Sequence, residues 1–313
     1  MLIDVAQMAG GLIVLLLAGD YLVRGAVNLA LRLGIPALMV GMTVVAFGTS
    51  APELLVSVKA VLSGAGGLAL GNVVGSNIAN ILLVMGLPAL IAPVLIGRDS
   101  LRDYAIMLAA TALFIGLSFT GVIALWQALV LLAAFALFMG ESIWRGRRTR
   151  TQPDDLEGAD QALPRAKLAL FLTLGLVGLP LGANLLVAGA VDIAETLGVS
   201  DVVIGLTIVA IGTSLPELAT TLMAAIRREG GVALGNILGS NIFNLLFILG
   251  VAGVVGPMVV PDTMLRLDLW VMLAAALVLA PFVWTGRAIG RVMGMLLLLG
   301  YVGYIWLLFA NGG

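Results

Sequence analysis

The chain alternates long apolar runs with short polar turns along nearly its whole length. Each run holds about 20 residues or more, enough for a helix to cross a hydrocarbon core of roughly 30 Å. Membrane strands would instead give alternating segments of about 10 residues. The pattern predicts an all-α polytopic membrane protein with ten transmembrane helices, over residues 8–30, 37–62, 68–94, 102–120, 122–144, 167–190, 201–226, 232–258, 267–284 and 288–310.

A single long polar segment separates two groups of five helices. Its Pro, Gly and mixed charges are typical of a solvated linker. We therefore expect a first five-helix repeat over residues 1–144, a cytoplasmic linker over 145–166 and a second five-helix repeat over 167–313.

The two halves repeat each other in sequence. At an offset of 164 positions and without gaps, residues 41–54 match 205–218 at 10 of 14 positions, and 70–80 match 234–244 at 8 of 11. Because each half has an odd number of spans, the second copy enters the membrane from the opposite side. The sequence thus predicts an inverted-topology repeat whose two signatures lie in 41–80 and 205–244.

Positive charge predicts the orientation. With the linker in the cytoplasm, 14 of the 16 Lys and Arg residues fall on that face, and only Lys59 and Arg266 fall on the other. This is the bias of cytoplasmic loops. The first run follows Asp4 rather than a basic segment and lacks a cleavage site, so we expect a retained helix. We predict a protein integral to the cell (inner) membrane, with both termini outside.

Composition narrows the chemistry that such a protein can perform. Hydrophobic residues make up 61% of the chain and charged residues 11%, and there is no cysteine and no histidine. Thiolate and imidazole metal sites are therefore excluded, as is a histidine proton switch. Any ion site in the membrane has to be built from oxygen atoms.

Two glutamates lie at membrane depth, in the second span of each half. Glu53 and Glu217 stand in the repeated segments "GTSAPE" and "GTSLPE", with no Lys or Arg within a helical turn. An ionised carboxylate at this depth costs several kcal/mol unless it faces a cavity, a partner or an ion. A protonated, purely structural glutamate is the alternative, but two unrelated ones would not share their flanking residues.

A proline precedes each of these glutamates and predicts a broken helix at the midplane. Pro52 and Pro216 have no N–H, so the carbonyl groups of Gly48 and Gly212 lose their helical partners. Positions 46, 49, 50 and 53 share one helix face, as do 210, 213, 214 and 217. Threonine and serine hydroxyl groups on these faces add neutral oxygen ligands.

The following span of each half adds further polar side chains. In "GNVVGSNIAN" (71–80) and "GNILGSNIFN" (235–244), an Asn-Ser-Asn row repeats at positions 72, 76, 80 and at 236, 240, 244. Asn77 and Asn241 lie beside these rows. Amide groups in the bilayer need partners, so we expect them to line the same cavity.

An all-oxygen site with two carboxylates suits hard cations. Ca²⁺ and Na⁺ fit a flexible mixture of carbonyl and carboxylate ligands better than Mg²⁺ does. One Ca²⁺ or two Na⁺ would neutralise two carboxylates, and competition for one site is the physical basis of exchange. A passive channel is a rival hypothesis, although so many ligands would hold ions too deeply for conduction. An intramembrane enzyme is another, but the acid/base set is too small, and we expect no catalytic residues.

These residues resemble the Ca²⁺/cation antiporter superfamily, specifically the prokaryotic Na⁺/Ca²⁺ exchangers. The resemblance rests on "GTSAPE" and "GTSLPE" and on the asparagine-rich segments that follow them. It implies that Glu53 and Glu217 are the central Ca²⁺ ligands, with the backbone carbonyl groups of Thr49 and Thr213. It also implies Na⁺ and cavity positions at Ser50, Ser214, Ser76, Ser240, Ala46, Ala210, Asn80 and Asn244, shared with both glutamates.

The family further implies an electrogenic exchange of three Na⁺ for one Ca²⁺ by alternating access. Our hypothesis for the movement is that the first and sixth spans move against the other eight. Many prokaryotic relatives and the K⁺-dependent branch have aspartate where Asn244 stands, which disfavours K⁺ dependence here. The Ca²⁺/H⁺ branch lacks the paired motif, yet exchange of protons or of another divalent cation stays an alternative. We expect membrane lipid and the transported cations as partners, no nucleic acid, no cofactor and a single chain as the transport unit.

Overall fold

The computed structural model describes residues 2–97, 100–148, 163–196 and 210–312. These residues are helical almost throughout. The elements of the first half are α1 (Leu2–Leu33), α2 (Ala37–Val40), the π-helical turn η1 (Gly41–Val45), α3 (Ala46–Thr49), α4 (Ala51–Leu62), α5 (Gly66–Ala79), η2 (Asn80–Val84), α6 (Gly86–Ile91), α7 (Leu101–Ser118), β1 (Val122–Ile123) and α8 (Leu125–Arg148). Those of the second half are α9 (Arg165–Thr196), α11 (Ala210–Thr213), α12 (Leu215–Ile226), α13 (Gly230–Ile242), η6 (Phe243–Ile248), α14 (Leu249–Val255), β2 (Met258–Val259), η7 (Met264–Asp268), α15 (Leu269–Val278), α16 (Ala280–Thr285) and α17 (Arg291–Gly312).

Eight helices within the described ranges are long and apolar enough to cross a membrane, or nine if the bent pair Ala37–Thr49 and Ala51–Leu62 forms one span. The helical segments coincide with the expected spans, with ends that differ by up to six residues. The expected span 201–226 lies partly outside the described residues, and its described part contains α11 and α12. The count of ten helices therefore stays a prediction.

Four expected helix boundaries, at residues 94, 122, 258 and 288, are wrong. Val94 and Ile289 form an antiparallel bridge between the end of α6 and the start of α17, so both lie outside the helices. Strand β1 pairs antiparallel with β2, with Val122 opposite Val259, so these residues are not helical. Gly121 has a φ of +80°, which ends the preceding segment in a left-handed turn, and its carbonyl accepts from the Val260 N–H at 2.9 Å. The short ladder satisfies backbone groups at two helix ends that meet.

The outer parts of the expected linker are also helical. Helix α8 continues to Arg148 and α9 begins at Arg165, inside the range 145–166 that the sequence assigns to the linker. Residues 149–162 lie outside the described part of the chain. The helices extend beyond the apolar runs because charged side chains are compatible with a helix once it leaves the hydrocarbon.

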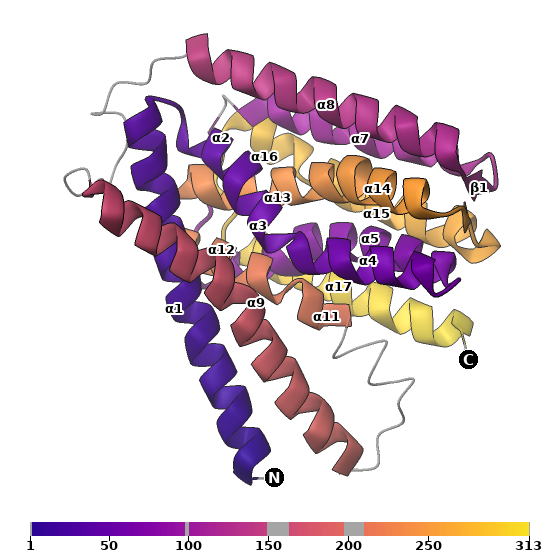
Figure 1. Ribbon diagram of the computed structural model, residues 1–313, viewed down its shortest axis with the longest axis horizontal. Coiled ribbons are helices and arrows are strands. Elements are labelled where there is room, and N and C mark those ends of the chain that lie inside the picture. Colours follow the sequence, from indigo (N-terminus) through magenta and orange to yellow (C-terminus); the bar gives the residue numbers. More distant parts are fainter. Residues whose placement is uncertain (1, 98–99, 149–162, 197–209, 313) are drawn as a thin grey trace.

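Helices α1 and α9 run obliquely across the other helices, which lie roughly side by side (Figure 1). The two long helices pack closely on each other through glycines. A Cβ atom at Gly175 would lie 2.5 Å from the Leu22 Cβ atom, and one at Gly182 would lie 2.8 Å from the Leu15 backbone nitrogen. Such close approach is possible only with small residues. The structure therefore contains a tightly packed α1–α9 pair that lies across the remaining bundle.

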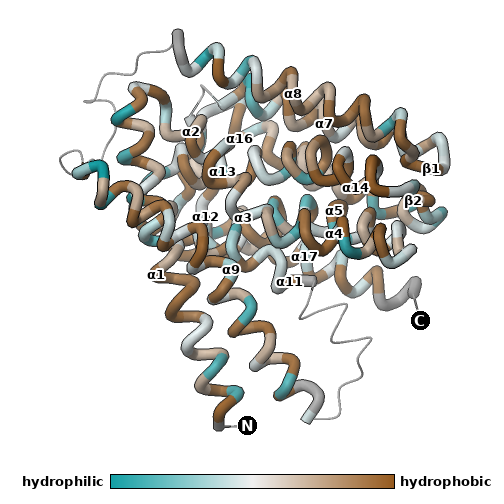
Figure 2. The backbone as a smooth tube through the Cα atoms, viewed as in Figure 1, coloured by the Kyte–Doolittle hydropathy of each residue, from teal (hydrophilic) through white to brown (hydrophobic). Residues whose placement is uncertain are grey.

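Large apolar side chains cover the outside of the bundle, as a lipid environment requires. Leu137 on α8 is 75% exposed, and Val292 and Trp306 on α17 are 79% and 67% exposed. Hydrophilic residues gather at the helix ends, including the start of α9 and the end of α1 (Figure 2). The chain is an integral membrane protein, with its polar interior formed by α3 to α5 and α11 to α13.

Candidate functional site

Each half contains a helix break directly before its glutamate. Ser50 lies between α3 and α4 with φ −84° and ψ 7°, and Ser214 lies between α11 and α12 with φ −88° and ψ 4°. Pro52 and Pro216 follow, in the first turns of α4 and α12. Proline is well suited to the first turn, where its missing N–H has no helical partner to lose. The expected broken helices are confirmed, and both glutamates stand in first turns of new helices.

The two glutamates are buried and lie close together. Glu53 and Glu217 are each 1% exposed. Ser50 of the first half donates a hydrogen bond to Glu217 Oε1 at 3.1 Å. Oε2 of each glutamate is buried and has no hydrogen-bond partner among the described residues. None of the ion pairs between described residues includes either glutamate.

In each half, an asparagine of the neighbouring helix donates a hydrogen bond to the backbone carbonyl of the glutamate, and the two arrangements are equivalent. Asn72 on α5 donates to the backbone carbonyl of the α4 glutamate at 3.4 Å and to Ser57 at 3.1 Å. Asn236 on α13 donates to the backbone carbonyl of the α12 glutamate at 3.3 Å and to Thr221 at 3.0 Å. In addition, Thr49 Oγ1 donates to Asn236 Oδ1 at 3.2 Å, which ties the two halves together.

Four further asparagine amides pair across the two halves. Asn80 Nδ2 donates to Asn241 Oδ1 at 3.4 Å, and Asn244 Nδ2 donates to Asn77 Oδ1 at 3.0 Å. The Oδ1 atoms of Asn80 and Asn244 are buried and accept no hydrogen bond from the described residues. The pairing thus uses the amide nitrogen of each of these two side chains and leaves its oxygen for another donor or a cation.

The other expected site residues lie on the same elements. Ser214 and Ser240 are almost fully buried, and within the described chain their hydroxyl oxygens have no hydrogen-bond partner. Ser76 on α5 is also buried. The Ala46 carbonyl accepts from the Ser50 N–H at 3.0 Å and from Thr49 Oγ1 at 3.3 Å. Thr213 and the backbone of Ala210 belong to α11, and the Ala210 side chain is not described.

Six buried oxygen-bearing side chains of these motifs contain an atom without a hydrogen-bond partner in the described chain: Glu53, Glu217, Asn80, Asn244, Ser214 and Ser240. A buried polar atom without a partner costs about 1–3 kcal/mol, and more when charged. Among the described residues, no group of three or more His, Cys, Asp or Glu side chains is placed to hold a metal ion. Two carboxylates with neutral oxygens around them therefore form a set of ligands for hard cations such as Ca²⁺ or Na⁺.

Four residues near the site received no role from the sequence. Ser57 and Thr221 accept hydrogen bonds from the asparagines described above, and Met272 and Met107 place sulfur 3.9 Å from Asn77 Nδ2 and 3.6 Å from Asn241 Nδ2. Ser57 and Thr221 are separated by the repeat offset, so a comparison of hydroxyl residues between the halves would have found them. The methionines are not related by that offset, and no sequence signal points to them.

Comparisons with known proteins agree with this arrangement. A family model described as sodium/calcium exchanger protein matches residues 3–144 and 167–310. The chain is 40% identical to the putative antiporter CaxA of Alkalimonas amylolytica, over 99% of this chain and 100% of that protein. It is 36% identical to the sodium/calcium exchanger MaX1 of Methanosarcina acetivorans, over 96% of each. The structure of the sodium-calcium exchanger NCX_Mj soaked with zero Na⁺ and Ca²⁺ superposes with a TM-score of 0.85 at 33% identity, over 98% of this chain and 99% of that chain.

Proposed function

Because this chain belongs to the sodium/calcium exchanger protein family, we propose that it is a secondary active antiporter that exchanges Na⁺ for Ca²⁺ across the cell membrane. The observation that carries this proposal is the pair of buried glutamates, one from each half. Ser50 bonds one of them across the halves, and each keeps a carboxylate oxygen without a partner in the described residues. Such a pair needs a cation, and both Ca²⁺ and Na⁺ satisfy it.

Each residue of the site has a proposed role. Glu53 and Glu217 bind Ca²⁺ through their carboxylates, and Thr49 and Thr213 bind it through backbone carbonyl groups. The Na⁺ and cavity positions use both glutamates together with Ser50, Ser214, Ser76, Ser240, Asn80, Asn244 and the carbonyl groups of Ala46 and Ala210. The unpartnered oxygens of Ser214, Ser240, Asn80 and Asn244 support these roles.

The charge of the site supports competition between the two ions. Two carboxylates carry a charge of −2, which one Ca²⁺ neutralises. Three Na⁺ exceed that charge by one, so an exchange of three Na⁺ for one Ca²⁺ moves one net charge per cycle. We propose this electrogenic stoichiometry. One charge is worth about 2.3 kcal/mol per 100 mV, so a negative interior favours extrusion of Ca²⁺.

The proposed architecture is that of two inverted five-helix repeats, residues 1–144 and 167–313, joined by the cytoplasmic linker 145–166, with both termini outside the cell and one chain as the transport unit. The α1–α9 pair alternately opens the site to each side. Its position supports this role, because α9 contacts both helix breaks: a Cβ atom at Gly48 would lie 2.0 Å from Leu176 Cδ2, and one at Gly212 would lie 2.4 Å from Val187 Cγ2.

Radioactive Ca²⁺ uptake into proteoliposomes tests the proposal. Vesicles loaded with Na⁺ should take up Ca²⁺, whereas vesicles loaded with K⁺ should not. Glu53→Gln and Glu217→Gln should each abolish uptake, because either change removes half of the carboxylate charge. Glu229→Gln serves as the control: it removes an acidic residue that lies away from the site, and uptake should persist.

Other outcomes would contradict the proposal in distinct ways. Uptake that a pH gradient drives without Na⁺ would replace Na⁺ by protons as the counter-ion. Uptake that proceeds with no counter-ion would identify a passive channel instead of an antiporter. Full activity of both glutamine variants would show that the two glutamates do not bind the transported ions.

A further inference from the structure

A polar pocket lies where α1, the start of α9 and the end of α12 meet, and none of the glutamate-site residues lines it. The pocket has a volume of about 250 Å³. Its lining includes three basic side chains, those of Arg24, Lys167 and Arg227, and one acidic side chain, that of Glu229. The transport mechanism proposed above gives this pocket no function.

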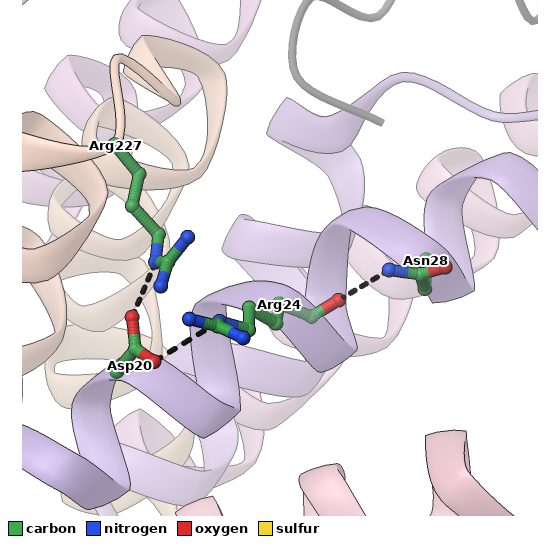
Figure 3. Close-up of polar contacts among 4 residues, drawn as sticks. All are labelled: Asp20, Arg24, Asn28 and Arg227. Carbon is green, nitrogen blue, oxygen red and sulfur yellow. Dashed lines mark hydrogen bonds and ion pairs between the residues drawn. The ribbon is translucent and has the colours of Figure 1, made fainter. Parts of the chain in front are cut away.

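Two of the basic residues share a single carboxylate (Figure 3). Asp20 lies between Arg24 and Arg227: Arg24 Nε contacts Asp20 Oδ2 at 3.0 Å, and Arg227 Nε contacts Asp20 Oδ1. Both contacts use the Nε atom of the arginine. A guanidinium group has five N–H donors, so the terminal amino groups of both arginines are able to bind a second anion without displacing Asp20.

The charge and accessibility of the pocket suit a monovalent anion. Three basic residues and two acidic ones, Asp20 and Glu229, leave one net positive charge. The Arg24 side chain is 45% exposed and that of Arg227 is 32% exposed, so an anion reaches them from outside the bundle. The Lys167 ammonium group lies 5.6 Å from the centroid of the Phe171 ring, at the same opening.

An apolar ridge leads away from this pocket along α9. Leu170, Leu174, Val177 and Leu181 follow Lys167 at helical spacing of three and four residues, and they are 53%, 41%, 52% and 55% exposed. Residues at this spacing lie on one face of a helix. A basic pocket at the top of an exposed apolar ridge matches the two chemical parts of a phospholipid, a charged headgroup and an acyl chain.

We propose that this pocket binds the phosphodiester group of an anionic membrane phospholipid, with Arg24, Arg227 and Lys167 as donors and the α9 ridge in contact with an acyl chain. The ligand touches α1, α9 and the end of α12 at once, so it stabilises the arrangement in which these three helices meet. The site does not depend on which ions the protein transports.

Thermal unfolding of the purified full-length protein in a neutral detergent tests the proposal, with the fluorescence of its five tryptophans as the signal. Dioctanoyl phosphatidylglycerol should raise the Tm in a saturable way, because it binds the folded state. Dioctanoyl phosphatidylcholine, which has the same chains and no net charge, should not. Inorganic phosphate is titrated separately, and half-saturation at the same concentration as the lipid would overturn the assignment to a phospholipid.

Single substitutions locate the binding site. Arg24→Gln and Lys167→Gln should each raise the half-saturating concentration about tenfold, the loss of about 1.4 kcal/mol expected for a charge-assisted hydrogen bond. Arg24→Gln leaves Asp20 paired with Arg227, so folding is preserved. Asp20→Asn should have the opposite effect, because the surroundings of the pocket lose one negative charge.

Arg287→Gln is the matched control, since it removes one exposed basic residue outside the pocket. The concentration of phosphatidylglycerol that half-saturates this variant should equal the concentration that half-saturates the unmodified protein. If Arg287→Gln weakened binding as much as Arg24→Gln, the lipid effect would reflect general surface charge and the pocket would not be a site. An equal response to phosphatidylcholine would overturn the proposal as well.

Discussion

At the scale of single residues, the chemistry depends on what surrounds two buried carboxylates. Burial of Glu53 and Glu217 opposes folding, because each is 1% exposed and neither forms an ion pair within the described chain. The hydroxyl of Ser50 and the first-turn position of each glutamate reduce this cost, because a helix N-terminus carries a partial positive charge. The remaining cost favours binding of a cation, which is the role proposed for this pair.

The Ser50 hydroxyl should set the position of the opposite glutamate. We expect Ser50→Ala to weaken Ca²⁺ binding about tenfold, because a hydrogen bond to a charged group contributes about 1.5–3 kcal/mol. Ca²⁺ binding to the purified protein by calorimetry is the measurement. Ser63→Ala is the control, since the exposed Ser63 donates only to its own helix, at Lys59. Unchanged affinity in Ser50→Ala would show that this bond does not position Glu217.

The pair Asn77 and Asn244 should act as a unit. The bond from Asn244 Nδ2 to Asn77 Oδ1 keeps the Asn244 oxygen available for a cation. Without it the amide is free to rotate and present its N–H groups instead. We expect Asn77→Ala and Asn244→Ala each to raise the Na⁺ concentration that half-activates exchange. In a double-mutant cycle, the free-energy change of the double variant should be smaller than the sum of the two single changes by about 1 kcal/mol. Strict additivity would exclude the positioning role of Asn77.

At the scale of elements, the two halves are joined where α2 and η1 of the first half contact the backbone of α13 in the second half. A Cβ atom at Gly235 would lie 2.4 Å from the Leu38 carbonyl oxygen, and one at Gly239 would lie 2.6 Å from Met42 Cα. The π-helical turn η1 leads into α3, which ends at the first helix break. Close contact at these glycines therefore fixes the position of α13 relative to the first helix break, and with it the position of one half of the site relative to the other.

A methyl group at this contact should separate the two helices. Gly235→Ala is expected to lower the free energy of unfolding by about 1–3 kcal/mol through overpacking, seen as a lower Tm in detergent. Gly140→Ala in the middle of α8 is the comparison, because a Cβ atom there would meet no described atom within 4 Å. That exposed position should gain about 1 kcal/mol in helix propensity. Equal behaviour of the two variants would contradict the importance of this contact.

At the scale of the whole molecule, α1 and α9 lie obliquely to the rest of the bundle (Figure 1) and pack closely on each other through glycines. The contacts of this α1–α9 pair include both helix breaks, through Leu176 and Val187. Motion of this pair would therefore change the surroundings of both glutamates together. This coupling is what alternating access to one central site requires.

Crosslinks should distinguish motion of the pair against the bundle from motion within the pair. The chain has no cysteine, so any disulfide that forms within it must join the two introduced residues. A Cβ atom at Gly19 of α1 would lie 3.3 Å from Met223 Cγ of α12. Oxidation of Gly19→Cys/Met223→Cys should abolish Ca²⁺ uptake, and reduction should restore it. Met8→Cys/Gly189→Cys joins α1 to α9, where the Cβ-to-Cγ separation is 2.9 Å. A Cβ atom at Gly189 would also lie 2.6 Å from the Asp4 carbonyl oxygen, so uptake by the reduced variant is the reference, and that uptake should survive oxidation. If the α1–α12 crosslink left uptake intact and the α1–α9 crosslink abolished it, movement of the α1–α9 pair as a unit against the bundle would be excluded.

Voltage dependence belongs to this scale as well. Because one net charge should cross per cycle, an inside-negative potential of 100 mV contributes about 2.3 kcal/mol to Ca²⁺ extrusion. Proteoliposomes clamped with K⁺ and valinomycin should therefore show Na⁺-driven Ca²⁺ transport that varies with the imposed potential. Transport that is independent of the potential would require an electroneutral stoichiometry.

The sequence by itself determined the helical class, the position of most spans and the two glutamate motifs. Apolar runs of membrane length permit only helices, and a proline beside a glutamate in each half breaks the helix in a recognisable place. These are local consequences of the chain, so the helix breaks at Ser50 and Ser214 agree with the prediction.

Only the tertiary structure decided which polar atoms meet. The bonds from Ser50 to Glu217 and from Asn244 to Asn77 each span 167 residues, and the ion pair of Asp20 with Arg227 joins α1 to the end of α12. The strand pair that contains Val122 and Val259 could not be predicted from the sequence either, since a strand of two residues is too short to show an alternating pattern. Contacts between distant segments depend on how helices pack, and the packing is set by the whole chain rather than by any one stretch of it.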